Sequence, residues 1–126
     1  LNYAVKNKKD IKEVCENTVK GYLDYMEEML STNYSQRYYF GVCAPTREKD
    51  LLDELDIKRI KVVQLYNFFL KKEVLSRGSY YLDVYKLTSN KNGENNQIHM
   101  CDSWHLSPKC LSILFENHLH EPIVSN

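Results

Sequence analysis

Apolar residues recur at steps of three and four in three stretches of the chain, and two short continuous apolar runs lie between them. Steps of three and four place apolar side chains on one face of a helix, whereas a continuous run of strand length is typical of a strand buried on both faces. The sequence therefore predicts the order helix, strand, helix, strand, loop, helix. The helices are predicted over residues 10–30, 58–76 and 108–119, and the strands over 38–43 and 80–85.

The ends of these elements carry local signals. Asp10 followed three residues later by Glu13 resembles a capping box, with Asp in the position that Ser or Thr usually holds. Arg77-Gly78 predicts the end of the second helix, and Ser107 before Pro108 predicts an N-cap with proline at the first helical position. These signals agree with the boundaries that the apolar spacing predicts.

Strands that alternate with helices of this length predict βαβ units and a parallel sheet. Two or three strands do not complete such a sheet, because edges and much of each face stay unpaired. We therefore expect residues 1–126 to be a single α/β domain or the C-terminal part of one. Its sheet would either receive strands from preceding sequence or associate with another chain, so self-association through the exposed edge is expected.

The composition argues against several classes of protein. The 17 Lys and Arg residues balance the 17 Asp and Glu residues, so the basic footprint of a nucleic-acid-binding protein is missing. No apolar run approaches the roughly 20 residues that span a bilayer. The four cysteines show no C-x-x-C spacing, and we interpret them as reduced thiols, which favours a cytoplasmic location without fixing one.

The most informative stretch places Asp102 three residues before His105 and just ahead of the predicted helix start at Ser107. A carboxylate this close to an imidazole can accept the Nδ1–H, which fixes the tautomer and leaves Nε2 as a general base for a hydroxyl nucleophile. In the alternative interpretation, Asp102 caps a turn and His105 is a hydrogen-bonded side chain without a chemical role.

Two further residues are candidates for contact with a substrate. Trp104 lies inside the same stretch and would form a pocket floor, mainly by packing. Arg47 follows the carboxyl end of the first predicted strand, where open α/β sheets bind ligands, and would line a pocket for an anionic or sugar substrate. A solvated Arg47 is the alternative.

We expect no metal site, because the metal-capable side chains near the second half of the chain lack the close pairs that zinc sites favour. These side chains are His99, Cys101, Asp102, His105 and Cys110.

The block Asp102–Pro108, which reads DSWHLSP, resembles the last block of SGNH (GDSL-type) hydrolases, an Asp-x-x-His followed by Leu-Ser-Pro and a terminal helix. Asn67, the strand near Tyr81 and the polar loop after it also follow the family's order. By element order the resemblance covers residues 38–119, although only the seven-residue block is specific. It implies a three-layer, flavodoxin-like parallel sheet with flanking helices, of which this chain is an incomplete C-terminal part.

The family's Gly-Asp-Ser-Leu-like nucleophile block and its oxyanion Gly and Asn are missing from these 126 residues. The resemblance therefore implies that the chain supplies Asp102 and His105 of a Ser-His-Asp triad, with the serine and oxyanion donors in preceding sequence. It implies an acyl-enzyme route without a cofactor, a small acylated or carbohydrate-ester substrate, and no activity for the isolated chain. The alternative function is a non-catalytic SGNH-like domain that binds a ligand or a partner.

Overall fold

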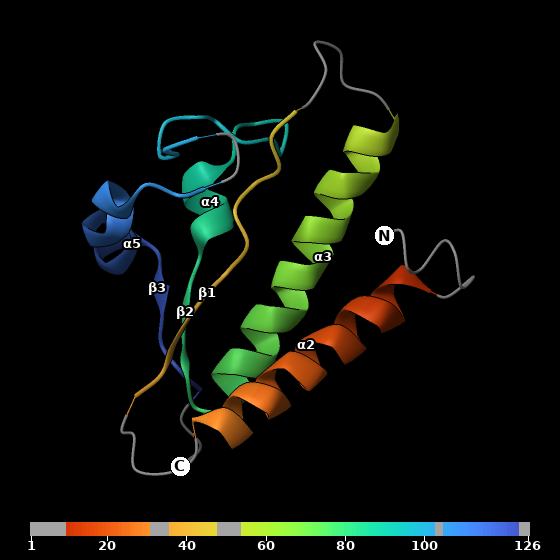
Figure 1. Ribbon diagram of the computed structural model, residues 1–126, viewed down its shortest axis with the longest axis vertical. Coiled ribbons are helices and arrows are strands. Elements are labelled where there is room, and N and C mark those ends of the chain that lie inside the picture. Colours follow the sequence, from red (N-terminus) through yellow and green to blue (C-terminus); the bar gives the residue numbers. More distant parts are fainter. Residues whose placement is uncertain (1–9, 31–35, 48–53, 103–104, 124–126) are drawn as a thin grey trace.

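A small three-stranded sheet with flanking helices forms the protein, as the computed structural model describes it for residues 10–30, 36–47, 54–102 and 105–123 (Figure 1). The element labels follow that figure. In chain order the elements are helix α2 (Ile11–Met29), strand β1 (Tyr38–Phe40), helix α3 (Glu54–Ser76), strand β2 (Tyr80–Leu82), helix α4 (Val84–Thr88), the 3-10 turn η1 (Pro108–Cys110), helix α5 (Leu111–Asn117) and strand β3 (Leu119–His120).

The strand order is β1-β2-β3, and β1 and β2 are parallel with Tyr39 opposite Tyr81. This arrangement confirms the predicted βαβ unit, because α3 connects the two parallel strands. The sheet is nevertheless mixed, since β3 pairs antiparallel with β2. The prediction that the last helix extends to residue 119 is wrong, because residues 119 and 120 form β3. They extend instead because the Asp83 N–H donates to the His118 carbonyl at 2.9 Å and Leu119 packs in a core beside β2.

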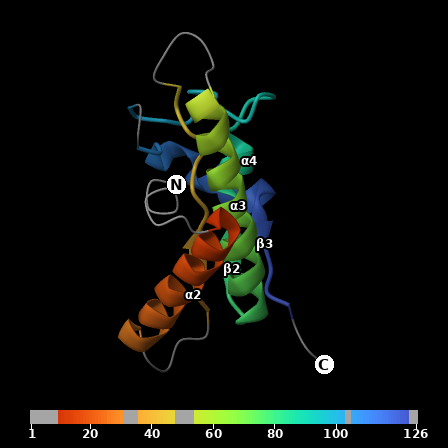
Figure 2. The same ribbon diagram turned by 90° about the vertical axis from the view of Figure 1, so that its right-hand side faces the viewer.

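Two neighbouring residues of β2 belong to two separate hydrophobic cores, one on each face of the sheet. Tyr81 and Leu82 are both almost fully buried, and successive side chains of a strand point to opposite faces. Tyr81 packs with residues of α2 and α3, whereas Leu82 packs with Leu114 of α5. Figure 1 accordingly shows α3 and α5 on opposite sides of the strands, and Figure 2 shows α2 crossing α3. The mixed α/β character is confirmed.

The helix boundaries largely match the prediction. Asp10 caps α2 by accepting a hydrogen bond from the Lys12 N–H at 3.0 Å. Helix α3 already includes Glu54, four residues before the predicted start, and ends before Gly78, whose φ of +82° is the left-handed conformation that glycine supplies. The last helix is split into η1 and α5, and Ser107 caps η1 as expected.

Both predicted strands are shorter than expected. After Leu82, the Asp83 carboxylate accepts from the Lys86 N–H at 3.0 Å and begins α4, so an N-cap ends the strand. The prediction that the first strand is buried on both faces is wrong. Within the described residues β1 is an edge strand, with Tyr39 buried but Tyr38 and Phe40 exposed by 41% and 48%.

Candidate functional site

The loops that follow β1 and β2 are joined by hydrogen bonds, because parallel strands bring their carboxyl ends to the same edge of the sheet (Figure 1). The Ala44 N–H donates to Thr88 Oγ1 at 2.9 Å, and the Asn95 amide donates to the Ala44 carbonyl at 3.0 Å. The Asn95 N–H also donates to the Pro45 carbonyl at 2.9 Å. We call residues 43–47 and 88–97 the loop platform.

An ion pair between Arg47 and the buried carboxylate of Glu94 completes the loop platform. The Arg47 guanidinium donates to both carboxylate oxygens of Glu94, a residue that is 5% exposed. The alternative prediction, a freely solvated Arg47, is therefore wrong. Contact between Arg47 and a substrate stays a prediction. The hydrogen bonds from Arg47 hold the pKa of the Glu94 carboxyl below its ordinary value of 4.5.

We expect Glu94→Gln to lower the free energy of unfolding by roughly 1–3 kcal/mol at neutral pH, because a charge-assisted bond is lost. A lowered folded-state pKa contributes stability that is complete above the unfolded value and is lost as pH falls through the folded value. The difference between wild type and variant should therefore shrink towards acid in urea unfolding measured from about pH 7 to about pH 3. The exposed Glu116→Gln is the control. A difference that stays constant across this range would contradict the assignment.

Residues 98–102 and 105–107 pair with each other at the same end of the sheet (Figure 1). The Ser107 N–H donates to the His99 carbonyl at 2.7 Å, and the Cys101 N–H donates to the His105 carbonyl at 2.9 Å. A bridge between Met100 and Leu106 lies between these two bonds. Pairing across the loop thus fixes the backbone on both sides of the candidate acid and base.

The predicted hydrogen bond between Asp102 and His105 is present. His105 Nδ1 lies 2.9 Å and 2.8 Å from the two carboxylate oxygens of Asp102. Because a carboxylate only accepts, Nδ1 of the neutral ring carries the proton and Nε2 is the acceptor that a general base needs. The His105 backbone N–H also donates to Asp102 Oδ1 at 2.8 Å, as the turn-capping interpretation expects. The two side chains are 73% and 55% exposed.

Asn67, which the resemblance names only for its place in the order of elements, makes two hydrogen bonds that the sequence does not predict. Its side-chain amide accepts from the Val42 N–H at 2.8 Å and donates to the Val42 carbonyl at 2.9 Å. The amide thus gives Val42 both bonds that a neighbouring strand would give. A single amide on an otherwise apolar face of α3 was the available signal.

The remaining candidates are placed as follows. Trp104 lies outside the described residues. Among the described residues, no three His, Cys, Asp or Glu side chains gather closely enough to hold a metal ion. The four cysteines, all of them described, are free thiols, and only Cys101 is exposed. No described helix combines the length and apolar character needed to cross a membrane.

Comparisons of the chain with protein-family models, with curated proteins and with solved structures gave no match.

Proposed function

We propose that this chain supplies the acid–base pair of a serine ester hydrolase of the SGNH type, with His105 as general base and Asp102 as the residue that orients it. The proposal is supported by one observation above all, the 2.8–2.9 Å contact between His105 Nδ1 and the Asp102 carboxylate. Leu106, next to His105, packs against the core cluster that contains Leu82, the last residue of β2, and open α/β sheets bind ligands at the carboxyl ends of their strands.

The same proposal extends the fold. We propose that the sheet is the C-terminal part of a three-layer, flavodoxin-like sheet. The parallel pair β1–α3–β2 and the separate cores on the two faces of β2 support this extension. Preceding sequence would supply the remaining strands, the nucleophilic serine and the oxyanion donors.

In this mechanism His105 Nε2 takes the proton of the serine hydroxyl as the oxygen attacks the ester carbonyl. The same proton then passes to the leaving alcohol, and an acyl-enzyme remains that water hydrolyses. Asp102 keeps the Nδ1 proton in place and stabilises the imidazolium that forms between these steps. The substrate is a small acylated or carbohydrate ester, and no cofactor takes part.

A second candidate function is a non-catalytic domain of the same type that binds a ligand or a partner. The exposure of both side chains and the bond from the His105 backbone N–H to Asp102 favour it, because a turn cap has these properties without any chemistry.

Covalent labelling with a fluorophosphonate separates the two candidates, since this probe reacts with a serine only when a base activates it. The longest natural polypeptide that contains residues 1–126 should be labelled at one serine, and His105→Ala should abolish the label. His118→Ala, at the end of α5, is the matched control and should keep it. An unlabelled wild-type polypeptide, or equal labelling of His105→Ala, would favour the non-catalytic domain.

A further inference from the structure

A pocket with a volume of about 190 Å³ lies between α3 and the segment that runs from β2 into α4. Its α3 lining residues share one face of that helix, because they follow steps of three and four, and its other lining residues follow steps of two. They include Gln64, Phe68 and Lys71 of α3, and Tyr81, Asp83 and Tyr85 of the second segment.

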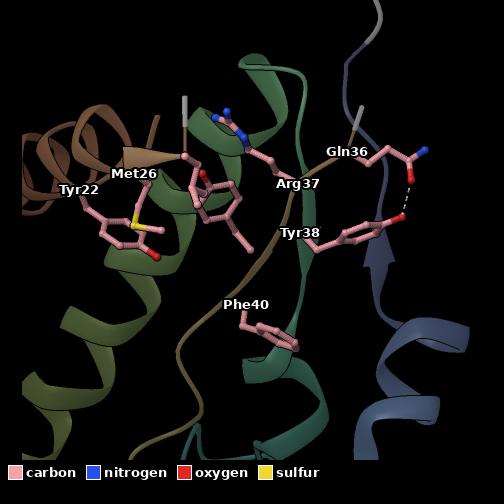
Figure 3. Close-up of a pocket in the computed structure, with 8 residues that line it drawn as sticks. Tyr22, Met26, Gln36, Arg37, Tyr38 and Phe40 are labelled. Carbon is pink, nitrogen blue, oxygen red and sulfur yellow. Dashed lines mark hydrogen bonds between the residues drawn. The ribbon is translucent and has the colours of Figure 1, made fainter. Parts of the chain in front are cut away.

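This pocket is separate from both regions that the proposed function uses. The groove between α2 and β1 (Figure 3) lies along the open edge of β1, where the proposed function adds strands. No described residue of α2 or β1 lines the pocket beside α3, so strands added at that edge would leave it open. Tyr81 and Leu82 point to opposite faces of the sheet, and Leu106, next to His105, packs on the Leu82 face. The pocket is therefore also distinct from the proposed active site.

The Tyr81 hydroxyl is a hydrogen-bonding group without a protein partner. Tyr81 is 1% exposed, and its hydroxyl makes no hydrogen bond to any residue that the structure describes. Every fully buried side-chain oxygen and nitrogen of the described residues has a hydrogen-bond partner, so this hydroxyl is not sealed in the core but reaches accessible space. Burial raises the pKa of Tyr81 above its ordinary value of 10, so the hydroxyl keeps its proton and is a donor at neutral pH.

Two opposite charges line the pocket without meeting each other. Lys71 forms no ion pair with Asp83 or with any other described residue. One Asp83 oxygen accepts from the Lys86 N–H at 3.0 Å, and the other lies 3.9 Å from His120 Nε2, beyond hydrogen-bond distance. The pocket therefore presents an ammonium group and a carboxylate oxygen that a ligand of the right charges would bring into use.

The pocket has the length of one small molecule. Gln64 and Lys71 are two helical turns apart on α3, which is about 10 Å along the axis. The Gln64 amide donates to the Tyr85 hydroxyl at 2.9 Å, and its own oxygen is left as an acceptor at that end. Phe68 lies between the two ends and is 59% exposed, so its ring supplies an apolar wall. The volume is that of about six water molecules in the liquid.

We propose that this pocket binds a small zwitterion, an amino acid with an aliphatic side chain. Lys71 and the Tyr81 hydroxyl bind its carboxylate, and Asp83 and the Gln64 amide oxygen bind its ammonium group. The Phe68 ring packs against its side chain. The charges decide the class of ligand, because a neutral sugar would use neither charge and a simple carboxylic acid would place an anion near Asp83.

The test is a titration with L-leucine, followed by NMR of the backbone amides in the longest natural polypeptide that contains residues 1–126. Two analogues are titrated in parallel: 4-methylpentanoate lacks the ammonium group, and 3-methylbutylamine lacks the carboxylate. Leucine should bind more tightly than either analogue and should shift the amide signals of Lys71 and Asp83, but not that of Leu114 on the opposite face. No shift up to the solubility limit of leucine, or an analogue that binds as tightly as leucine, would overturn the proposal.

Two charge variants assign the two ends of the ligand. Lys71→Gln should weaken leucine about ten-fold, because a charge-assisted hydrogen bond is lost, and should leave 3-methylbutylamine unchanged. Asp83→Asn should weaken leucine and 3-methylbutylamine but not 4-methylpentanoate. Asn also accepts from the Lys86 N–H, so α4 keeps its cap. Lys72→Gln is the matched control, because Lys72 is the next residue of α3 and lines a different pocket. Equal leucine affinities of Lys71→Gln and Lys72→Gln would overturn the proposal.

Tyr81→Phe tests the hydroxyl. The thermal melt should stay close to that of the wild type, since the hydroxyl bonds to no described residue. The affinity for leucine and for 4-methylpentanoate should fall about two- to ten-fold, the effect of one lost hydrogen bond to a ligand. Unchanged affinity in a variant with a wild-type melt would contradict the role of Tyr81 in binding the carboxylate.

Discussion

Replacing His105 with Ala should lower kcat for a short-chain aryl ester by on the order of 10⁴-fold in the polypeptide that carries the nucleophile, with little change in KM. Base and nucleophile act as a unit, so loss of the Nε2 acceptor removes proton transfer in the transition state but leaves substrate contacts in place. Asp102→Asn should also lose much of the rate, because the Asn amide can donate to Nδ1 and favour the wrong tautomer.

The fold should survive both changes. The side chains of His105 and Asp102 are 73% and 55% exposed, so neither truncation opens a core cavity. Thermal melts should therefore show losses of no more than about 1 kcal/mol. Wild-type turnover by His105→Ala with an unchanged melt would remove the catalytic role and leave the binding domain as the function.

A large effect on stability is expected from Gly41→Ala. A Cβ at this position would lie 2.2 Å from the hydroxyl oxygen of Tyr81 and 2.8 Å from its Cζ. Tyr81 is 1% exposed and packed between α2 and α3, so the ring has little room to move. We expect the free energy of unfolding to fall by about 1–3 kcal/mol in urea denaturation.

Gly21→Ala is the matched control, because Gly21 lies within α2 and a Cβ there meets no atom within 4 Å. It should raise stability by about 0.5–1 kcal/mol through the higher helix propensity of alanine. Tyr81→Phe should recover part of the Gly41→Ala loss, since the 2.2 Å contact disappears and the 2.8 Å contact remains. Equal stability of Gly41→Ala and wild type would contradict the close approach.

The contact between Asp102 and His105 was predictable because its geometry is local. Asp102 and His105 are three residues apart, and Ser107 fixes the start of the next helix. Strand β3 was not predictable, because two residues are too few to show the alternation of apolar and polar positions that is typical of a strand. Strand β2 ends where Asp83 caps α4. This cap was not predictable, because Asp83 lies within a run of apolar and aromatic residues that is typical of a strand.

The loop platform was not predictable for the opposite reason. Residues 88–97 read as a polar turn, and nothing near them in the sequence indicates that Glu94 and Asn95 become buried. Their partners Arg47 and Ala44 lie far away along the chain, and only the parallel pairing of β1 with β2 brings them together.

This contrast in chain separation has a consequence for the order of folding. The hydrogen bond between Asn95 and Ala44 joins residues 51 positions apart, and the ion pair between Glu94 and Arg47 joins residues 47 positions apart. Asp102 and His105 are only three positions apart. Closing a long loop requires more chain entropy than closing a short one, and long-range contacts form slowly. The Asp102–His105 contact can thus form while the chain is still open, and the His105 ring can be held in one tautomer before the sheet has assembled.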